Sequence, residues 1–329
     1  MYTIDTHTHI MPKEMPDYSK KFGYGDFIHL KHHKPGKAWM MQGEKQFREI
    51  EENCWDAEVR IKQMQEHKAD VQVICTIPVL FSYWAKAKDG LEVSKFLNDD
   101  IATTVNNYPD KFVGLCTVPM QDTKLAIQEL ERCMKNGYKG IQIGSNVNNL
   151  NLNETQFDEF WAACESLNAA VLVHPWQMMG QEHMNKYWLP WLVGMPAEIS
   201  RAICSMIFGG IFEKYKKLKV CFAHGGGSFL PTISRIEHGW ECRPDLVAID
   251  NEHNPKNYLG KFWVDSHVCD HKMLQYIIDL IGEDKVVQGS DYPFPLGEAV
   301  PGELVRSSPL NKATQEKIMA SNAKTWLGI

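Results

Sequence analysis

Two histidines, His7 and His9, stand one residue apart near the start of the chain, in the stretch "YTIDTHTHI". The β-branched and aromatic residues around them favour a strand over residues 2–7. Side chains two positions apart on a strand share a face. Two neutral imidazoles at this spacing can bind a divalent cation such as Zn²⁺. An isolated H-x-H can equally be a polar pair in a capped turn, so the rest of the chain must decide.

More side chains that bind metals or transfer protons follow other apolar runs. They are His174, His224, Asp265, His267 and Asp291. A single buried histidine is usually a hydrogen-bonded core residue, but histidines and an aspartate after four different strands are hard to explain in that way. Imidazole nitrogens and one carboxylate oxygen form a ligand set that Zn²⁺, Co²⁺ or Fe²⁺ accepts while a water position stays open. The pattern therefore indicates one metal site.

Apolar runs alternate with helical patterns along the whole chain. We predict strands at residues 2–7, 71–76, 112–118, 140–144, 170–175, 219–226, 262–267 and 285–291, and helices at 56–67, 91–108, 123–136, 153–167, 196–213, 229–240, 272–281 and 311–326. This alternation predicts a parallel α/β sheet with right-handed crossovers. Eight units favour a single (β/α)8 TIM barrel over residues 1–329, whose strand ends would converge on one rim. A doubly wound open sheet is the alternative, but no G-x-G-x-x-G follows a strand.

Residues 11–54 interrupt this alternation after the first predicted strand. The segment is polar, rich in glycine, proline, lysine and histidine, and long for a βα loop. We expect an irregular insertion over the C-terminal mouth of the barrel, where βα loops build active sites. Its basic and aromatic content favours a substrate lid or flap over a mobile surface loop.

Composition limits the classes of partner and the location. The formal net charge is −6 and no lysine- or arginine-rich tract is present, so no nucleic-acid partner is expected. The most apolar stretch contains Pro196, Glu198 and Arg201, so we expect no membrane span. Nine scattered cysteines without a C-x-x-C indicate reduced thiols, mostly in the core, and favour a cytoplasmic protein. No signal peptide is expected at the N-terminus.

Five longer motifs are spread over nearly the whole chain. They read "FREIEENCWDAEVRI" (residues 47–61), "LVHPWQMMG" (172–180), "LPWLVGMPAE" (189–198), "HGGGSF" (224–229) and "GSDYPFPLGE" (289–298). With the H-x-H pair, they resemble the amidohydrolase superfamily and, within it, the aminocarboxymuconate-semialdehyde decarboxylase family. The HGGG sequence alone also occurs in lipases, but no G-x-S-x-G accompanies it here.

This resemblance implies a single divalent metal ion, Zn²⁺ in the first place, with a bound water. The implied ligands are His7, His9, His174 and Asp291, and His224 is implied as an acid/base that does not bind the metal. In binuclear relatives a carboxylated lysine follows the fourth strand. Here that strand ends "IQIGSN", with no lysine, so one metal is expected. Asp265 and His267 match no ligand position, and we interpret them as supporting or structural residues.

The resemblance also implies a small dicarboxylate substrate, whose carboxylates need cations to hold them. Arg48 and Arg235 are the implied candidates. In the family the second arginine comes from the partner subunit, so a homodimer is expected. Lys37 is a further candidate for substrate binding, and Trp191 and Phe294 are expected to form walls of the pocket.

The implied reaction is the non-oxidative decarboxylation of 2-amino-3-carboxymuconate 6-semialdehyde to 2-aminomuconate 6-semialdehyde and CO₂. It would belong to the kynurenine branch of tryptophan catabolism, or to a related aminobenzoate or nitroaromatic route. Two chemical routes stay open: addition of a metal-bound hydroxide with help from His224, or direct protonation of carbon by His224 or Asp291. The alternatives are a resorcylate-type aromatic-acid decarboxylase, a metal-dependent hydrolase, and a barrel that only binds metal or partners.

Overall fold

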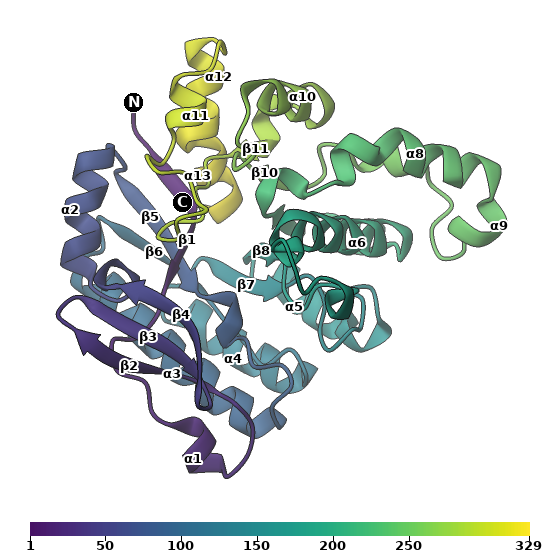
Figure 1. Ribbon diagram of the computed structural model, residues 1–329. Coiled ribbons are helices and arrows are strands. Elements are labelled where there is room, and N and C mark those ends of the chain that lie inside the picture. Colours follow the sequence, from purple (N-terminus) through teal and green to yellow (C-terminus); the bar gives the residue numbers. More distant parts are fainter.

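Eight parallel strands pair in the order in which they occur along the sequence. The computed structural model describes residues 1–329, and its helices surround this sheet (Figure 1). The strands are β1 (Ile4–Ile10), β5 (Val71–Thr76), β6 (Phe112–Cys116), β7 (Gly140–Gly144), β8 (Ala170–His174), β9 (Lys219–Phe222), β10 (Trp263–Asp265) and β11 (Val286–Val287).

The sheet closes on itself between β1 and the segment that follows β11. The amide of His9 donates to the carbonyl of Tyr292 at 2.7 Å, and the amide of Asp291 donates to the carbonyl of His7 at 2.9 Å. Thr8 and Tyr292 form a parallel bridge at the same place. This closure confirms the predicted (β/α)8 barrel and excludes the open sheet. We call this junction the closing seam.

The principal helices follow the predicted order. They are α2 (Ala57–His67), α3 (Ala87–Asn107), α4 (Thr123–Lys135), α5 (Asp158–Ser166), α6 (Met195–Phe208), α8 (Phe229–Cys242), α10 (His271–Ile281) and α13 (Asn322–Leu327), with shorter α7 (Ile211–Lys214), α9 (Pro244–Val247), α11 (Glu303–Arg306) and α12 (Lys312–Glu316). Aspartates cap several of them, and Asp56 accepts from two amides of the first turn of α2. The predicted helix over residues 196–213 is interrupted at Gly209–Gly210, where Gly210 has a φ of +69°.

The last strands are shorter than predicted. The run predicted at residues 219–226 leaves the sheet after Phe222, because His224, Gly225 and Gly226 all have positive φ. Likewise, the run predicted at 285–291 pairs with β10 only at Val286 and Val287. The catalytic candidates of these two segments therefore stand on turns beyond the strand ends and not on the strands themselves.

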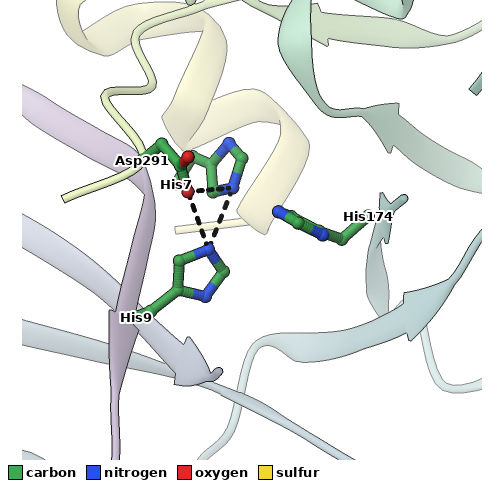
Figure 2. Close-up of side chains that lie close together, drawn as sticks. All are labelled: His7, His9, His174 and Asp291. Atoms are coloured by element: carbon green, nitrogen blue, oxygen red, sulfur yellow. Dashed lines mark hydrogen bonds and ion pairs between the residues drawn. The ribbon is translucent and has the colours of Figure 1, made fainter. Parts of the chain in front are cut away.

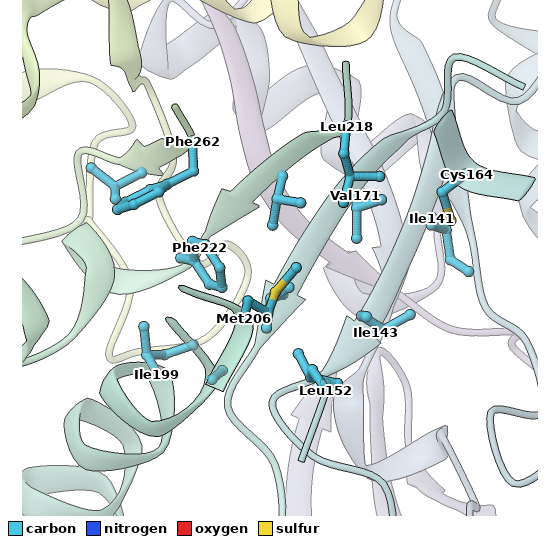
Figure 3. Packing of buried hydrophobic residues seen from close by; sticks show 14 of the residues in the cluster. Ile141, Ile143, Leu152, Cys164, Val171, Ile199, Met206, Leu218, Phe222 and Phe262 are labelled. Atoms are coloured by element: carbon cyan, nitrogen blue, oxygen red, sulfur yellow. The ribbon is translucent and has the colours of Figure 1, made fainter. Parts of the chain in front are cut away.

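The core has two main layers. Strand residues such as Ile141, Ile143, Val171 and Phe222 pack against the helices (Figure 3). Alternate strand residues form a second cluster with the last helix, α13; they include Ile4, Val73, Leu115 and Leu172. Side chains on opposite faces of the same strands thus hold the barrel together from both sides.

The segment after β1 differs from the expectation of an irregular insertion. It contains a short helix, α1 (Tyr18–Phe22), and an antiparallel sheet of β2 (Ile28–Lys34), β3 (Lys37–Gln42) and β4 (Lys45–Glu51). Two-residue turns at Pro35–Gly36 and Gly43–Glu44 connect these strands, and both glycines have positive φ. One side of this sheet contributes Ile28, Ala38, Met40 and Ile50 to a third apolar cluster. The same cluster contains Ile77 and Leu80 from the loop after β5, and Val93 and Leu97 from α3, so the β2–β4 sheet is folded and packs against the barrel.

One helical stretch, Pro190–Phe208, is long and apolar enough by length and composition to cross a membrane. Its second part is α6, which buries Ile199, Ala202, Ile203, Met206 and Ile207 in the layer between barrel and helices. Packing inside the barrel fold therefore accounts for the apolar character of α6, whereas Leu192 and Val193 in the first part of the stretch are exposed.

A substitution at Gly140 tests the strand packing. A Cβ atom at this position would lie 1.9 Å from the carbonyl oxygen of Ala170 on the neighbouring strand. We expect Gly140→Ala to destabilise the protein by about 3 kcal/mol or more, because backbone atoms must separate. Gly239→Ala on α8 is the control, since its Cβ would meet nothing within 4 Å. Thermal unfolding followed by circular dichroism measures both, and equal midpoints would contradict the prediction.

Candidate metal centre

Four side chains converge at the C-terminal end of the barrel (Figure 2): His7, His9, His174 and Asp291. One ligand atom of each lies within 4.8 Å of the other three. His9 Nε2 lies 3.0 Å from Asp291 Oδ1 and 3.2 Å from His7 Nε2. Ligands of a tetrahedral Zn²⁺ lie roughly 3.4 Å apart, given metal–ligand distances of about 2.1 Å. The predicted ligand set is therefore brought together at the spacing of a single ion.

A bulge in β1 gives the two first ligands their direction. The pairing with β5 shifts register between Asp5 and Thr8. Ile4 belongs to the second core cluster, which also includes Val73, Leu115 and Leu172. Side chains alternate between the two faces of a regular strand, so without the bulge His7, three residues after Ile4, would point to the opposite face from Ile4. The bulge therefore turns both histidines toward the centre of the barrel mouth.

Each ligand histidine has its Nδ1 next to an acceptor outside the site. His7 Nδ1 lies 2.7 Å from Asp265 Oδ2, His9 Nδ1 lies 3.1 Å from the carbonyl of Thr76, and His174 Nδ1 lies 3.0 Å from the carbonyl of Pro175. These acceptors favour the tautomer with hydrogen on Nδ1, which leaves the Nε2 lone pair toward the centre.

The Nε2 atom of His174 gives a second test of the fit. It is buried and has no hydrogen-bond partner. A buried polar atom without a partner is costly, and a metal ion bound to its lone pair would remove that cost. The donor set and this unpartnered nitrogen both fit a divalent cation.

Asp265 supports the site from below. Its carboxylate receives His7 Nδ1 and also the backbone amides of His224, Gly225 and His267 at 2.9, 2.9 and 3.1 Å. Burial alone would raise the pKa of Asp265, but the hydrogen bond from His7 and the neighbouring histidines lower it to about 2. An ionised Asp265 thus holds both the ring of His7 and the turn that carries His224.

The charge of the ligands follows from their surroundings. Burial would raise the pKa of Asp291, but the hydrogen bond with His9 and the charges of the nearby histidines hold it well below its usual value. Burial and the neighbouring imidazoles lower the pKa of His174 well below its usual value. Asp291 is therefore ionised and His174 neutral at pH 7, the forms that bind a metal.

His224 faces the cluster without joining it. Its ring stacks 5.3 Å from the ring of His7, and its Nε2 lies 3.9 Å from Asp291 Oδ2. Burial lowers the pKa of His224 to about 4, so the ring is neutral at pH 7 and can accept a proton. Both His224 and Asp291 have positive φ, 55° and 62°, a conformation that costs a non-glycine residue roughly 1–2 kcal/mol.

A cavity of about 420 Å³ opens above the cluster. His9, His174 and Asp291 form its floor, and its walls come from the β2–β4 sheet and from the loop after β8. Both residues that were expected to form its walls, Trp191 and Phe294, line the cavity. The ring of Phe294 lies 5.8 Å from the ring of His9.

Of the three cationic residues predicted to bind substrate, only Arg48 lies at the cavity. Arg48 lines the cavity and is the one lysine or arginine that does. Its guanidinium lies 4.9 Å from the centre of the Phe294 ring and has no carboxylate partner. Lys37 lies at the far end of β3, where it pairs with Glu51 at 3.0 Å, and it does not line the cavity. Arg235 is exposed on α8, also outside the cavity.

Sequence reasoning missed part of the cavity wall. Trp188 lines the cavity and stacks on Trp191, with ring centres 5.5 Å apart, and Met178 and Met195 lie beside them. Of this tryptophan-rich stretch, only Trp191 was predicted from the sequence to form part of the wall. The sequence offered a partial signal, because Trp188 stands three residues before Trp191. The structure places Trp188 just before the helical stretch that starts at Pro190, with a φ of +54°.

Comparisons with known proteins agree with this geometry. The family model described as amidohydrolase matches residues 4–329. The 2-amino-3-carboxymuconate-6-semialdehyde decarboxylase of Dictyostelium discoideum is 53% identical, covering 99% of this chain and 91% of the relative. The enzyme of the same name from Caenorhabditis elegans is 37% identical, covering 99% and 94%.

A solved structure shows the same fold at lower identity. The 5-carboxyvanillate decarboxylase of Novosphingobium aromaticivorans, crystallised with manganese and 4-hydroxy-3-methoxy-5-nitrobenzoic acid, superposes with a TM-score of 0.83. It is 22% identical, and the match covers 100% of this chain and 96% of that structure. At this identity the likeness supports the fold alone.

The support of His7 by Asp265 can be tested separately from catalysis. In Asp265→Asn, an amide nitrogen would face either His7 Nδ1 or the backbone amides of the His224 turn. We expect metal affinity to fall about 10- to 100-fold. Competition with a chromophoric chelator measures the affinity, and Asp279→Asn, an exposed site whose carboxylate contacts only Gln275, is the control. Equal affinities for both variants would contradict the supporting role.

Proposed function

The chain belongs to the amidohydrolase family, and we propose that it is a metal-dependent carboxy-lyase that converts 2-amino-3-carboxymuconate 6-semialdehyde into 2-aminomuconate 6-semialdehyde and CO₂. The observation that carries this proposal is the whole-chain similarity to decarboxylases of that name. The four-ligand cluster at the floor of a cavity with one free arginine supports it. A γ-resorcylate decarboxylase is only 23% identical to this chain, so the resorcylate-type alternative is the weaker one.

We propose Zn²⁺ as the ion, because three imidazoles and one carboxylate suit it; Co²⁺ and Fe²⁺ accept the same set. His7, His9, His174 and Asp291 would hold it. When bound, the ion would polarise a water or substrate oxygen and lower its pKa. A net positive centre also favours an anionic substrate at this end of the barrel.

The remaining roles belong to His224, which lies beside Asp291, and to residues that line the cavity. A neutral His224 can take a proton at Nε2 and return it to the substrate carbon that loses CO₂. Arg48 can bind one carboxylate with two parallel hydrogen bonds, because no protein carboxylate competes for it. The flat faces of Trp191 and Phe294 suit a planar conjugated substrate. The folded β2–β4 sheet, which carries Arg48, would act as the lid.

A dicarboxylate needs a second cation, and the cavity of one chain offers only Arg48. We propose that Arg235 of a second copy supplies it. Helix α8, which carries Arg235, projects from the barrel (Figure 1). It buries Phe229, Leu230 and Ile233, and no residue after them. Exposed Leu246 and Ile249 follow on the same projecting part of the chain. A projecting helix with apolar residues beyond it is typical of a subunit contact.

The cellular setting is part of the same proposal. All nine cysteines are unpaired, and six of them are buried, which suits a reducing compartment such as the cytoplasm. We place the reaction in the kynurenine branch of tryptophan catabolism, or in an equivalent route for aminobenzoates. There it would compete with the spontaneous cyclisation of the semialdehyde.

A coupled optical assay tests the proposed reaction. Substrate is generated in place from 3-hydroxyanthranilate by its ring-opening dioxygenase, and the loss of the semialdehyde absorbance is followed together with CO₂ release. Metal-loaded protein should accelerate the loss, and chelator-stripped protein should not until Zn²⁺ is restored. A metal-loaded protein that leaves the decay at the rate of spontaneous cyclisation would overturn the proposed substrate. Turnover of a 2,6-dihydroxybenzoate under the same conditions would then favour the resorcylate-type alternative.

A mixing experiment tests the shared site and the role of His224. His224→Ala should keep its metal and lose roughly 100-fold or more in kcat. Arg235→Ala should also be inactive at low substrate, since one carboxylate lacks its cation. A hybrid dimer of the two variants contains one complete site, so random mixing should restore about a quarter of the parental rate. Verified hybrids without activity would contradict an arginine donated across the interface.

A further inference from the structure

Arg60, on helix α2, is a buried positive charge that the proposed reaction does not use. Its side chain is fully buried, and no carboxylate lies within ion-pair distance of it. A buried guanidinium without an anion is costly unless all its donors are satisfied. Burial lowers the pKa of Arg60, but an arginine remains charged in a folded protein. Such a residue needs a reason for its place.

Each of the five N–H groups of Arg60 has an acceptor. Nε and Nη2 donate to Gln72 Oε1 at 3.1 and 2.9 Å. Nη2 also donates to Thr8 Oγ1 at 3.1 Å. Nη1 donates to the carbonyls of His9 and Asn53 at 2.6 and 3.0 Å. The geometry uses the full fork of the guanidinium, which a lysine ammonium cannot reproduce.

The two contacts of Arg60 that matter most lie on opposite sides of the closing seam. On one side it binds the carbonyl of the metal ligand His9. On the other side its guanidinium lies 4.7 Å from the centre of the Tyr292 ring, and Tyr292 directly follows the ligand Asp291. The amide of His9 in turn donates to the carbonyl of Tyr292. Arg60 thus spans the junction between two ligand-bearing segments.

We propose that Arg60 is a positioning residue of the metal centre, which sets the separation between the ligand atoms of His9 and Asp291 by holding both segments from outside the barrel. Those ligand atoms lie 3.0 Å apart, although their residues are 282 positions apart in the sequence. No covalent link restrains them, so a clamp that grips both segments limits how far they separate. A small change in that separation weakens binding of the ion, because the ion needs all ligands at once.

The experiment compares Arg60 with its hydrogen-bond partner Gln72. Arg60→Met removes the fork and keeps the volume of the stem, and Arg60→Lys keeps the charge without the fork. Gln72→Met is the matched control: it removes the one oxygen that accepts two hydrogen bonds from Arg60, and Gln72 hydrogen-bonds to neither His9 nor Tyr292. For each variant, Zn²⁺ affinity is measured by chelator competition and the unfolding midpoint is measured on metal-free protein.

We expect Arg60→Met and Arg60→Lys to bind Zn²⁺ about 10- to 100-fold more weakly than the parent. Gln72→Met should lower the unfolding midpoint while its Zn²⁺ affinity stays within about threefold of the parent. The visible spectrum of Co²⁺-loaded Arg60→Lys should differ from that of the parent, since the ligand geometry changes. Parental affinity in a folded Arg60→Met, or affinity losses that merely follow the unfolding midpoints across all variants, would overturn the inference.

A second site keeps the test decisive if Arg60→Met does not fold. Tyr292→Leu removes the ring under the guanidinium and should weaken Zn²⁺ binding, whereas Tyr292→Phe keeps the ring and should not. Equal affinity for these two variants would also overturn the inference. The inference rests on the proposed metal centre, and the parent separates the two: a parent that binds no Zn²⁺ refutes the centre, and a parent that binds it as tightly as the Arg60 variants refutes only the clamp.

Discussion

The closing seam between β1 and the segment after β11 is the constraint on which the rest of the structure depends. Three of the four ligands, His7, His9 and Asp291, lie on its two sides. Hydrogen bonds of 2.7 and 2.9 Å fix the register of these segments, and this register sets the distances between the ligand atoms. The fourth candidate ligand, His174, comes from the opposite part of the barrel, so the four side chains meet only if the barrel is closed. Formation of the site therefore depends directly on closure of the barrel.

Hydrogen bonds and neighbouring charges fix the orientation of the imidazoles and the ionisation of the carboxylates at the site. Acceptors outside the centre fix the Nδ1 side of all three imidazoles, so their Nε2 atoms all face inward. Two carboxylates stay ionised, one in the centre and one below it, because histidines surround both. Above this layer the only cation of the cavity is Arg48. The arrangement attracts an anion to the mouth, and in the proposed mechanism proton transfer is left to His224.

Much of this arrangement could be predicted from the sequence, because polar residues after parallel strands must meet at one rim. The order of strands and helices followed from the alternating pattern, and the convergence of histidines and aspartates at one rim followed from that rule. The choice of His7, His9, His174 and Asp291 as ligands came from the family resemblance. The β2–β4 sheet was missed although two-residue turns with glycine at Pro35–Gly36 and Gly43–Glu44 indicate hairpins. The burial of Arg60 could also have been predicted from the sequence. Arg60 lies on the apolar side of α2 with Ile61 and Met64, and a charged residue there indicates buried hydrogen-bond partners. The bulge in β1 had none, since register depends on the neighbouring strand.

The seam has a consequence for how the protein is made. Its two sides are separated by nearly the whole chain, so a ribosome that has synthesised β1 and its two histidines must add some 282 further residues before Asp291 is available. During that time the first strand has only β5 as a neighbour, and the exposed edge can pair wrongly. The candidate metal centre is therefore completed last, when the barrel closes. Binding of the ion at that moment would make it a check that synthesis and folding are complete.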